Sequence, residues 1–157
     1  MLCVGLSKNV DVSGVLATGR PLAVDAKVAV PAFGSYTFPE PGRIALEIDR
    51  VDRNLGVCGT IDIVAAGACD RCLCVLERPV HIDVDECLAP NDDVEGELAD
   101  SNVLHGAQLD VADLARQLVD SALPMLLLCS DDCPGLCPSC GLSRREVACA
   151  CPPSVER

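Results

Sequence analysis

Cysteine is the residue type in this sequence with the most evident chemistry. The chain has 12 cysteines among 157 residues, and half of them follow residue 128. Clustered cysteines form disulfides in oxidising compartments, whereas in the reducing cytosol they more often bind zinc as thiolates. The candidate metal ligands of this C-terminal group are Cys129, Cys133, Cys137, Cys140, Cys149 and Cys151.

The segment Cys137-Pro-Ser-Cys140-Gly141 is the centre of the predicted metal site. Two residues between the thiols let both sulfurs face one ion, and Gly141 tolerates a positive φ in the turn. Because tetrahedral zinc takes four ligands, two more must come from the other four thiols of the group. Six thiols exceed the need of one site, so either two are spare or two ions share bridging thiolates. Four thiolates suit iron as well as zinc.

A thiol-redox pair is the alternative interpretation of this motif, since Cys137-Pro-Ser-Cys140 is also a CxxC sequence. Redox CxxC motifs usually open a helix after a strand, and this one lies in a segment rich in proline and glycine. A catalytic zinc needs an open coordination position and a nearby base, but His81 and His105 are far away in sequence. We therefore predict structural zinc and no catalytic residues.

A second group of thiols lies in Cys69-Asp-Arg-Cys72-Leu-Cys74. If this segment is a strand, Cys69 points to the face opposite Cys72, which is poor geometry for one ion unless a bulge intervenes. Cys69 and Cys72 are a possible second thiol site, and the alternative is buried cysteine that packs as a small apolar residue. The isolated Cys3, Cys58 and Cys87 are expected to be structural.

Residues 1–86 show the alternation of apolar and polar residues that is typical of half-buried antiparallel strands. We expect an antiparallel sheet or a small barrel of five or six strands, with turns at residues 39–42 and 53–56 and near residues 77–79. The core must be aliphatic, because the chain has two Phe, one Tyr and no Trp. The alternating sets are Val24, Ala26, Val28 and Val30; Ile44, Leu46 and Ile48; Val57, Gly59, Ile61 and Ile63; and Val80, Ile82 and Val84.

The rest of the chain divides into three predicted parts. Residues 87–108 are acidic and rich in turn formers, which indicates a flexible loop. Residues 109–128 have helical spacing after Asp110, a possible N-cap, and Pro124 should end or kink the helix. Residues 129–157 have too little apolar content for a core, so metal binding must order them. The fold class is therefore α+β: a β domain, one helix and a Cys-rich, zinc-bound C-terminal tail.

Charge and hydropathy narrow the expected location and partners. The formal charge is −12, which opposes nucleic-acid binding through the whole surface, and residues 86–132 carry 11 acidic residues and one basic residue. The first residues have neither a basic region nor a sustained apolar run, so no secretory signal is expected. Leu123–Cys129, the longest apolar stretch elsewhere, is far too short to span a membrane. We expect a cytoplasmic protein.

In combination, these motifs resemble the YceD family of large ribosomal RNA subunit accumulation proteins. The resemblance rests on Cys69-Asp-Arg-Cys72-Leu, the acidic linker, the helix that runs into Leu123-Pro124, and the tail motif from Asp132-Cys133 to Cys140-Gly, closed by Cys149-Ala-Cys151. It implies a bacterial or plastid protein linked to large-subunit rRNA accumulation, without known enzymatic activity. Some family members lack the C-terminal cysteines, which implies that the tail stabilises the protein. Cys74 and the low aromatic content depart from the family pattern.

The resemblance implies two kinds of partner. One is the large-subunit precursor itself, contacted through arginines of the sheet or the tail, and the other is a basic ribosomal protein attracted by the acidic segment. Each arginine also has the plainer interpretation of a solvated surface charge. The candidate contact residues are Arg71, Arg78, Arg144 and Arg145. The leading hypothesis is thus a non-enzymatic ribosome-biogenesis factor with a structural zinc tail, and the alternative is a thiol-redox or metal-handling protein.

Overall fold

The computed structural model of the chain describes residues 2–3, 9–89, 103–145 and 149–151. Its largest element is a six-stranded sheet in the order β1-β3-β5-β6-β4, with β7 paired to the other edge of β6. β1 joins β3 in parallel, and the other pairs are antiparallel. The strands are β1 (Leu2–Cys3), β3 (Leu22–Val28), β4 (Tyr36–Thr37), β5 (Gly42–Val51), β6 (Asn54–Ala68) and β7 (Val75–Leu88).

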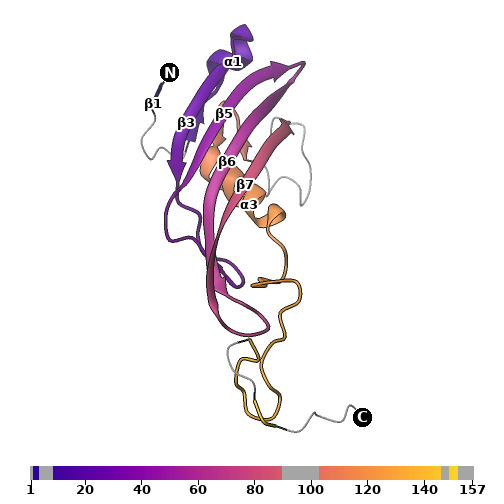
Figure 1. Cartoon of the computed structure of the whole chain (residues 1–157). Helices are drawn as coiled ribbons and strands as arrows, with labels where there is room; N and C mark the ends of the chain where they lie inside the picture. The colour runs from indigo at the N-terminus through magenta and orange to yellow at the C-terminus, as the bar shows by residue number, and fades with distance from the viewer. Residues whose placement is uncertain (1, 4–8, 90–102, 146–148, 152–157) are drawn as a thin grey trace.

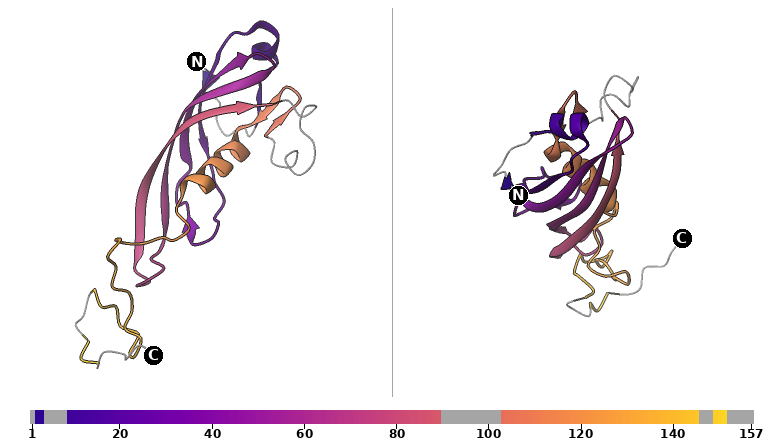
Figure 2. Two further views of the ribbon diagram at one scale, coloured as in Figure 1. Left: turned by 90° about the vertical axis from the view of Figure 1, so that its right-hand side faces the viewer. Right: turned by 90° about the horizontal axis from the view of Figure 1, so that it is seen from above.

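A second, smaller sheet and two helices complete the described part. The small sheet has the order β2-β9-β8, and the helix α3 lies against one face of the large sheet (Figures 1 and 2). At the opposite end from the small sheet, the β6–β7 hairpin extends past α3 toward the C-terminal segment. The remaining elements are β2 (Asn9–Asp11), β8 (Leu104–His105), β9 (Gln108–Asp110), α1 (Ser13–Thr18) and α3 (Val111–Ala122).

The core between the large sheet and α3 is aliphatic, as predicted. The alternating residues of β3, β5 and β6 are buried, for example Val24, Ile44 and Ile61, and α3 adds Leu114 and Val119 from the other side. Burial of these side chains supplies the main driving force for this part of the fold. The structure confirms the expected fold class: an antiparallel sheet with few helices and a Cys-rich C-terminal region.

The predicted helix of residues 109–128 is shorter in the structure. Its N-terminus is as expected, because the Asp110 carboxylate accepts a hydrogen bond of 2.9 Å from the Asp113 N–H. Its C-terminus is at Ala122, six residues early, because Leu123 precedes a proline and adopts extended backbone (φ −82°, ψ 139°). Residues 123–128 are therefore free to run as an extended connection toward the tail.

Three further expectations need correction. The turn expected near residues 77–79 is wrong, because β7 passes through it; Pro79 pairs with Val64 on an edge strand, where its missing N–H leaves no ladder bond unmade. The short helix α1 was not expected, and seven strands, not five or six, begin before residue 87 in the described part. The loop expected at 87–108 is replaced at its ends by β7 and by the β8–β9 hairpin, and residues 90–102 lie outside the described residues.

No helix in the described ranges is long and apolar enough to span a membrane.

Gly59, in the middle of β6, occupies a position that other residues cannot adopt without strain. Its φ is +153°, and a Cβ there would collide with the backbone carbonyl of Ala45 on β5. We expect Gly59→Ala to lower the free energy of unfolding by more than about 1 kcal/mol, measured by urea denaturation. Gly14→Ala is the control, because a Cβ at Gly14 in α1 meets nothing within 4 Å and alanine favours a helix. Equal stability of the two variants would contradict this account.

Candidate metal centres

The segment that joins β6 to β7 is a tight turn and not the strand that was considered for the second group of thiols. The Cys69 N–H donates to the Cys74 carbonyl, and the Leu73 N–H donates to the Cys69 carbonyl, both at 2.9 Å. Leu73 has a φ of +60°, which reverses the chain direction. The turn removes the face alternation of a strand, so Cys69 and Cys72 point toward the same site. The geometric objection to a shared ion at these residues was therefore wrong.

The connection after α3 is fixed to this hairpin tip through Asp70. The Asp70 N–H donates to the Leu127 carbonyl at 2.8 Å, and the Leu127 N–H donates to the Asp70 carboxylate at 2.6 Å. The same carboxylate accepts a hydrogen bond from Ser35 Oγ. Hydrogen bonds to an ionised acceptor are among the stronger ones in proteins. This pairing brings Cys129, two residues after Leu127, to the tip of the hairpin.

Two of the arginines that were candidate partner contacts also hold the tail. Arg71 Nη1 donates to the carbonyls of Asp131 and Cys133 at 3.1 and 3.4 Å, and Arg78 Nη2 donates to the carbonyl of Leu128 at 3.0 Å. Both side chains therefore have an intramolecular role that sequence reasoning missed. RNA or partner contact by Arg71, Arg78, Arg144 and Arg145 stays a prediction.

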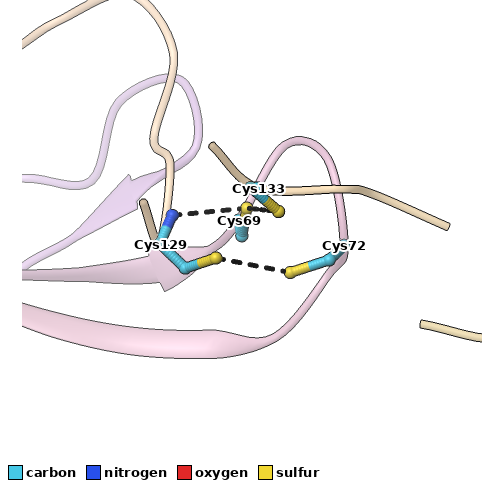
Figure 3. A group of neighbouring side chains, drawn as sticks. All are labelled: Cys69, Cys72, Cys129 and Cys133. Carbon is cyan, nitrogen blue, oxygen red and sulfur yellow. Dashed lines mark hydrogen bonds between the residues drawn. The ribbon is translucent and has the colours of Figure 1, made fainter. Parts of the chain in front are cut away.

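The first set of four thiols consists of Cys69 and Cys72 from the hairpin and Cys129 and Cys133 from the tail (Figure 3). Their sulfurs all lie within 4.8 Å of one another. The Cys69–Cys133 sulfur distance is 3.8 Å and the Cys72–Cys129 distance is 3.7 Å. A Zn–S bond of about 2.3 Å gives a tetrahedron with sulfurs about 3.8 Å apart, whereas a disulfide needs about 2.05 Å. The four thiols are thus spaced as ligands of one ion.

Burial and hydrogen bonds set the protonation of the first set. Cys69, Cys72 and Cys133 are buried and Cys129 is half-buried. Burial raises the pKa of Cys69, but the backbone N–H groups of Cys129 and Arg71 outweigh it and lower that pKa to about 6. The Gly135 N–H lowers the pKa of Cys133, but burial and the Cys129 sulfur outweigh it and raise that pKa to about 12.

These opposite pKa shifts describe thiols that share protons because they stand too close to ionise together. A divalent cation would replace the shared protons and let all four bind as thiolates.

Two other side chains lie against the first set. Cys74 Sγ is 3.3 Å from Cys72 Sγ, and this hydrogen bond is the main cause that raises the pKa of Cys74 to about 12. Cys74 is therefore a neutral thiol whose sulfur accepts a hydrogen bond from the Cys72 thiol. The guanidinium of Arg145 forms a hydrogen bond with the Cys129 sulfur, which raises the pKa of Arg145. Since four thiolates around a divalent ion carry excess negative charge, this arginine offsets part of it.

The second set of four thiols consists of Cys137, Cys140, Cys149 and Cys151, again within 4.8 Å of one another. The CPxCG turn forms as predicted: Gly141 has a φ of +73°, and its N–H donates to the Cys137 carbonyl at 2.8 Å. The backbone N–H groups of Cys140 and Ser139 lower the pKa of Cys137 to about 6. Cys137 is buried, but Cys140 is exposed and the other two are half-buried. The second set is therefore more open to solvent than the first.

In the structure, the six tail thiols belong to two different sets and do not form a single site. Cys149 and Cys151 complete the set of Cys137 and Cys140, which is one of the options that the sequence left open. Cys129 and Cys133 instead join Cys69 and Cys72. The thiols thus form two separate sets of four, in place of the two arrangements expected from the sequence, in which two thiols were spare or two ions shared thiolates. Four pairs of cysteines, two of them CxxC, were the signal in the sequence for this division. Cys58 and Cys87 are exposed and lie outside both sets.

The donor chemistry of both sets fits a structural metal. Among the residues that the structure describes, each set consists of four sulfur atoms, which suits tetrahedral zinc and also iron. A fully thiolate, four-coordinate ion has no open position for a substrate or an activated water. The fold and these sets define a class of protein. It is an antiparallel β domain whose longest hairpin and C-terminal tail together contribute the cysteines of a candidate metal site.

Comparison with known proteins identifies the family to which the chain belongs. Residues 57–156 match the family described as Large ribosomal RNA subunit accumulation protein YceD, and the chain belongs to this family. The matched range contains all eight thiols of the two sets. The resemblance inferred from the cysteine motifs is thereby confirmed.

Two mycobacterial relatives show how much of a related protein the chain represents. It is 30% identical to Uncharacterized protein Rv2926c of Mycobacterium tuberculosis over 100 residues, 62% of this chain and 48% of the relative. It is 26% identical to Uncharacterized protein ML1660 of Mycobacterium leprae over 115 residues, 66% of this chain and 49% of the relative. The chain thus spans about half the length of these relatives. No solved structure matches it significantly.

We expect the metal-loaded protein to contain two ions per chain, one for each set of four thiols. Cys133→Ser should lower the count to one by removing a ligand from the first set, and Cys140→Ser should do the same in the second. Cys133 is preferred to Cys72 because Cys74 lies beside Cys72 and could replace it. The measurement is elemental analysis of purified protein by mass spectrometry.

Cys58→Ser is the control for this experiment, because Cys58 is exposed and belongs to neither set. It should keep both ions. A single ion in the wild-type protein, or the loss of both ions in either ligand variant, would contradict two independent sites.

The two ions should also leave at different rates. Because the second set is more exposed, a chelator such as EDTA should remove its ion first, in a biphasic release followed with a colorimetric zinc indicator. Cys140→Ser should abolish the fast phase, and Cys133→Ser should abolish the slow phase. Release of both ions in one phase would count against a difference in solvent access.

Proposed function

We propose that the chain is a non-enzymatic factor that supports accumulation of large-subunit ribosomal RNA, and that two zinc ions stabilise its C-terminal part. The family match over residues 57–156 is the observation that carries this proposal, because it spans the hairpin tip, the helix and both thiol sets. The closed four-thiol coordination supports a structural role for the metal. A bacterial cytoplasm, where thiols stay reduced, is the compartment that suits these sites.

The proposed partner is the large-subunit precursor or a basic ribosomal protein. The formal charge of −12 favours a cationic protein over bare RNA, because the chain would have to be attracted to phosphates against its own field. The lack of tryptophan and the small number of other aromatic residues leave little surface for base stacking. Of the two partners, the surface therefore suits a basic ribosomal protein better.

The test is a sucrose-gradient profile of a strain that lacks the gene. We expect fewer free large subunits and a lower ratio of large- to small-subunit rRNA, restored by the wild-type gene. Cys58→Ser should restore the profile fully, whereas Cys133→Ser should restore it partly or not at all, because the tail would lose its first ion. An unchanged profile in the deletion strain would refute the proposal.

A thiol-redox function is the second candidate, and one observation favours it. Backbone N–H groups lower the pKa of Cys69 and Cys137 to about 6, and thiols with a depressed pKa are typical of reactive CxxC motifs. In metal-loaded protein these sulfurs are ligands and are not available as nucleophiles. Catalytic reduction of a disulfide substrate by the metal-loaded protein would favour this candidate, and inert thiols would favour structural zinc.

A further inference from the structure

A groove of about 350 Å³ lies where the loop before β4 meets the chain that leaves α3. Its apolar walls are Phe33 and Tyr36 on one side and Leu123, Pro124 and Met125 on the other. Its volume falls within the range of pockets that bind ligands or side chains. The groove belongs to neither thiol set.

The groove holds most of the chain's aromatic content. The Phe33 ring centroid is 6.1 Å from that of Tyr36 and 5.6 Å from that of Phe38, and these three residues are all the aromatic residues of the sequence. Tyr36 is buried, but Phe33 and Phe38 are half-buried. In a chain with an aliphatic core, the aromatic rings are thus gathered at one partly open site, as they often are where proteins bind partners.

Hydrogen bonds hold the two walls in place. Phe33 and Tyr36 exchange backbone hydrogen bonds of 3.1 and 2.9 Å around a turn in which Gly34 has a φ of +55°. The Tyr36 hydroxyl donates to the Pro124 carbonyl at 2.7 Å and so ties one wall to the other. The backbone of both walls is therefore fixed before a ligand binds.

The rim of the groove exposes apolar surface that the described part of the chain does not cover. The side chain of Met125 is 98% exposed, and that of the next residue, Leu126, is 58% exposed. Single exposed apolar residues are ordinary, but two consecutive ones beside an apolar groove make a continuous surface whose burial would be favourable.

The charged residue that lines the groove is negative, whereas Asp70 and Arg78, of opposite charge, both lie near Tyr36. Asp120 lines it from the last turn of α3, a turn with no basic residue. The C-terminus of a helix carries partial negative charge, so an aspartate there is unfavourably placed unless a cation lies nearby. On the opposite wall, the Ser35 hydroxyl donates to the carboxylate of Asp70. A positively charged group would relieve the repulsion between Asp120 and the helix end.

We propose that this groove docks a cationic protein segment, with an apolar side chain between Phe33 and Met125 and a neighbouring lysine or arginine against Asp120 and the end of α3. RNA fits poorly, because its phosphates would meet Asp120 and the negative helix end. This proposal deepens the proposed function and rests on it for its biological meaning, but peptide binding in solution is measured independently of subunit profiles.

The test uses the metal-loaded full chain and fluorescein-labelled peptides in a fluorescence anisotropy titration. The probe is a short peptide with one phenylalanine flanked by lysines, and the comparison peptide has glutamates in place of the lysines. We expect saturable binding of the lysine peptide and none of the glutamate peptide. Asp120→Lys and Met125→Ser should each weaken binding at least about fivefold. Both residues are exposed, so neither substitution should disturb the fold.

Two matched variants control for general effects. Asp83→Lys makes the same charge change at a side chain that is 91% exposed on β7, and Val51→Ser removes apolar surface at the β5–β6 turn. Both should bind the lysine peptide like the wild type. Equal weakening by Asp83→Lys and Asp120→Lys would show non-specific attraction and overturn the proposal.

Three other outcomes would also overturn the proposal. They are absence of lysine-peptide binding, tighter binding of a single-stranded RNA than of the lysine peptide, and self-association that Met125→Ser abolishes in analytical ultracentrifugation. A normal subunit profile in the deletion strain together with specific peptide binding would instead refute the proposed function and leave the groove assignment standing.

Discussion

The C-terminal part of this protein depends on one arrangement: four sulfurs from two distant segments lie within 4.8 Å of one another, as the ligands of one tetrahedral ion would. Cys69 and Cys133 are separated by 64 positions in sequence, yet their sulfurs are 3.8 Å apart. The chain between them forms a strand of the sheet, the β8–β9 hairpin and α3 before it returns. A metal that closes so long a loop removes much conformational entropy from the unfolded chain, which is where its stabilising effect would be largest.

The rest of the tail explains why that closure matters. After Leu127, the buried apolar residues in the described part are mainly cysteines, and a cluster of Cys69, Cys72 and Cys133 takes the place of a hydrophobic core. The direct hydrogen bonds at this junction involve exposed or half-buried groups, such as those of Arg71 and Arg78 with tail carbonyls. Solvent-exposed contacts of this kind contribute modestly. Metal ligation would therefore add a second strong interaction, beside the Asp70–Leu127 hydrogen bonds, that holds the tail on the hairpin.

The sequence predicts the β domain well because alternation reports directly which side of a strand is buried, as Ile44 and Ile61 show. Local sequence patterns do not predict the structure of a segment whose conformation depends on a long-range contact. Pro79 suggested a turn because nothing local shows that β7 is an edge strand. Whether Cys69 to Cys74 form a strand or a turn was left open, because the positive φ of Leu73 is not a property of its residue type. The CPxCG turn was found, since its signal is local. The division of the thiols into two sets could not be predicted, because it depends on the lengths of β6 and β7, which determine where the turn with Cys69 and Cys72 lies.

This geometry also couples the thiol set to the groove. The Tyr36 hydroxyl holds Pro124, and the Asp70 backbone and carboxylate hold Leu127. Cys129 follows as a candidate ligand, so a bound metal would give these six residues a third anchor. Met125 and Leu126 lie between the first two anchors and are exposed. Ligation of a metal at Cys129 would add a third fixed point. A metal bound by the Cys-rich tail would then do more than stabilise the protein: it would also fix one wall of the proposed docking groove.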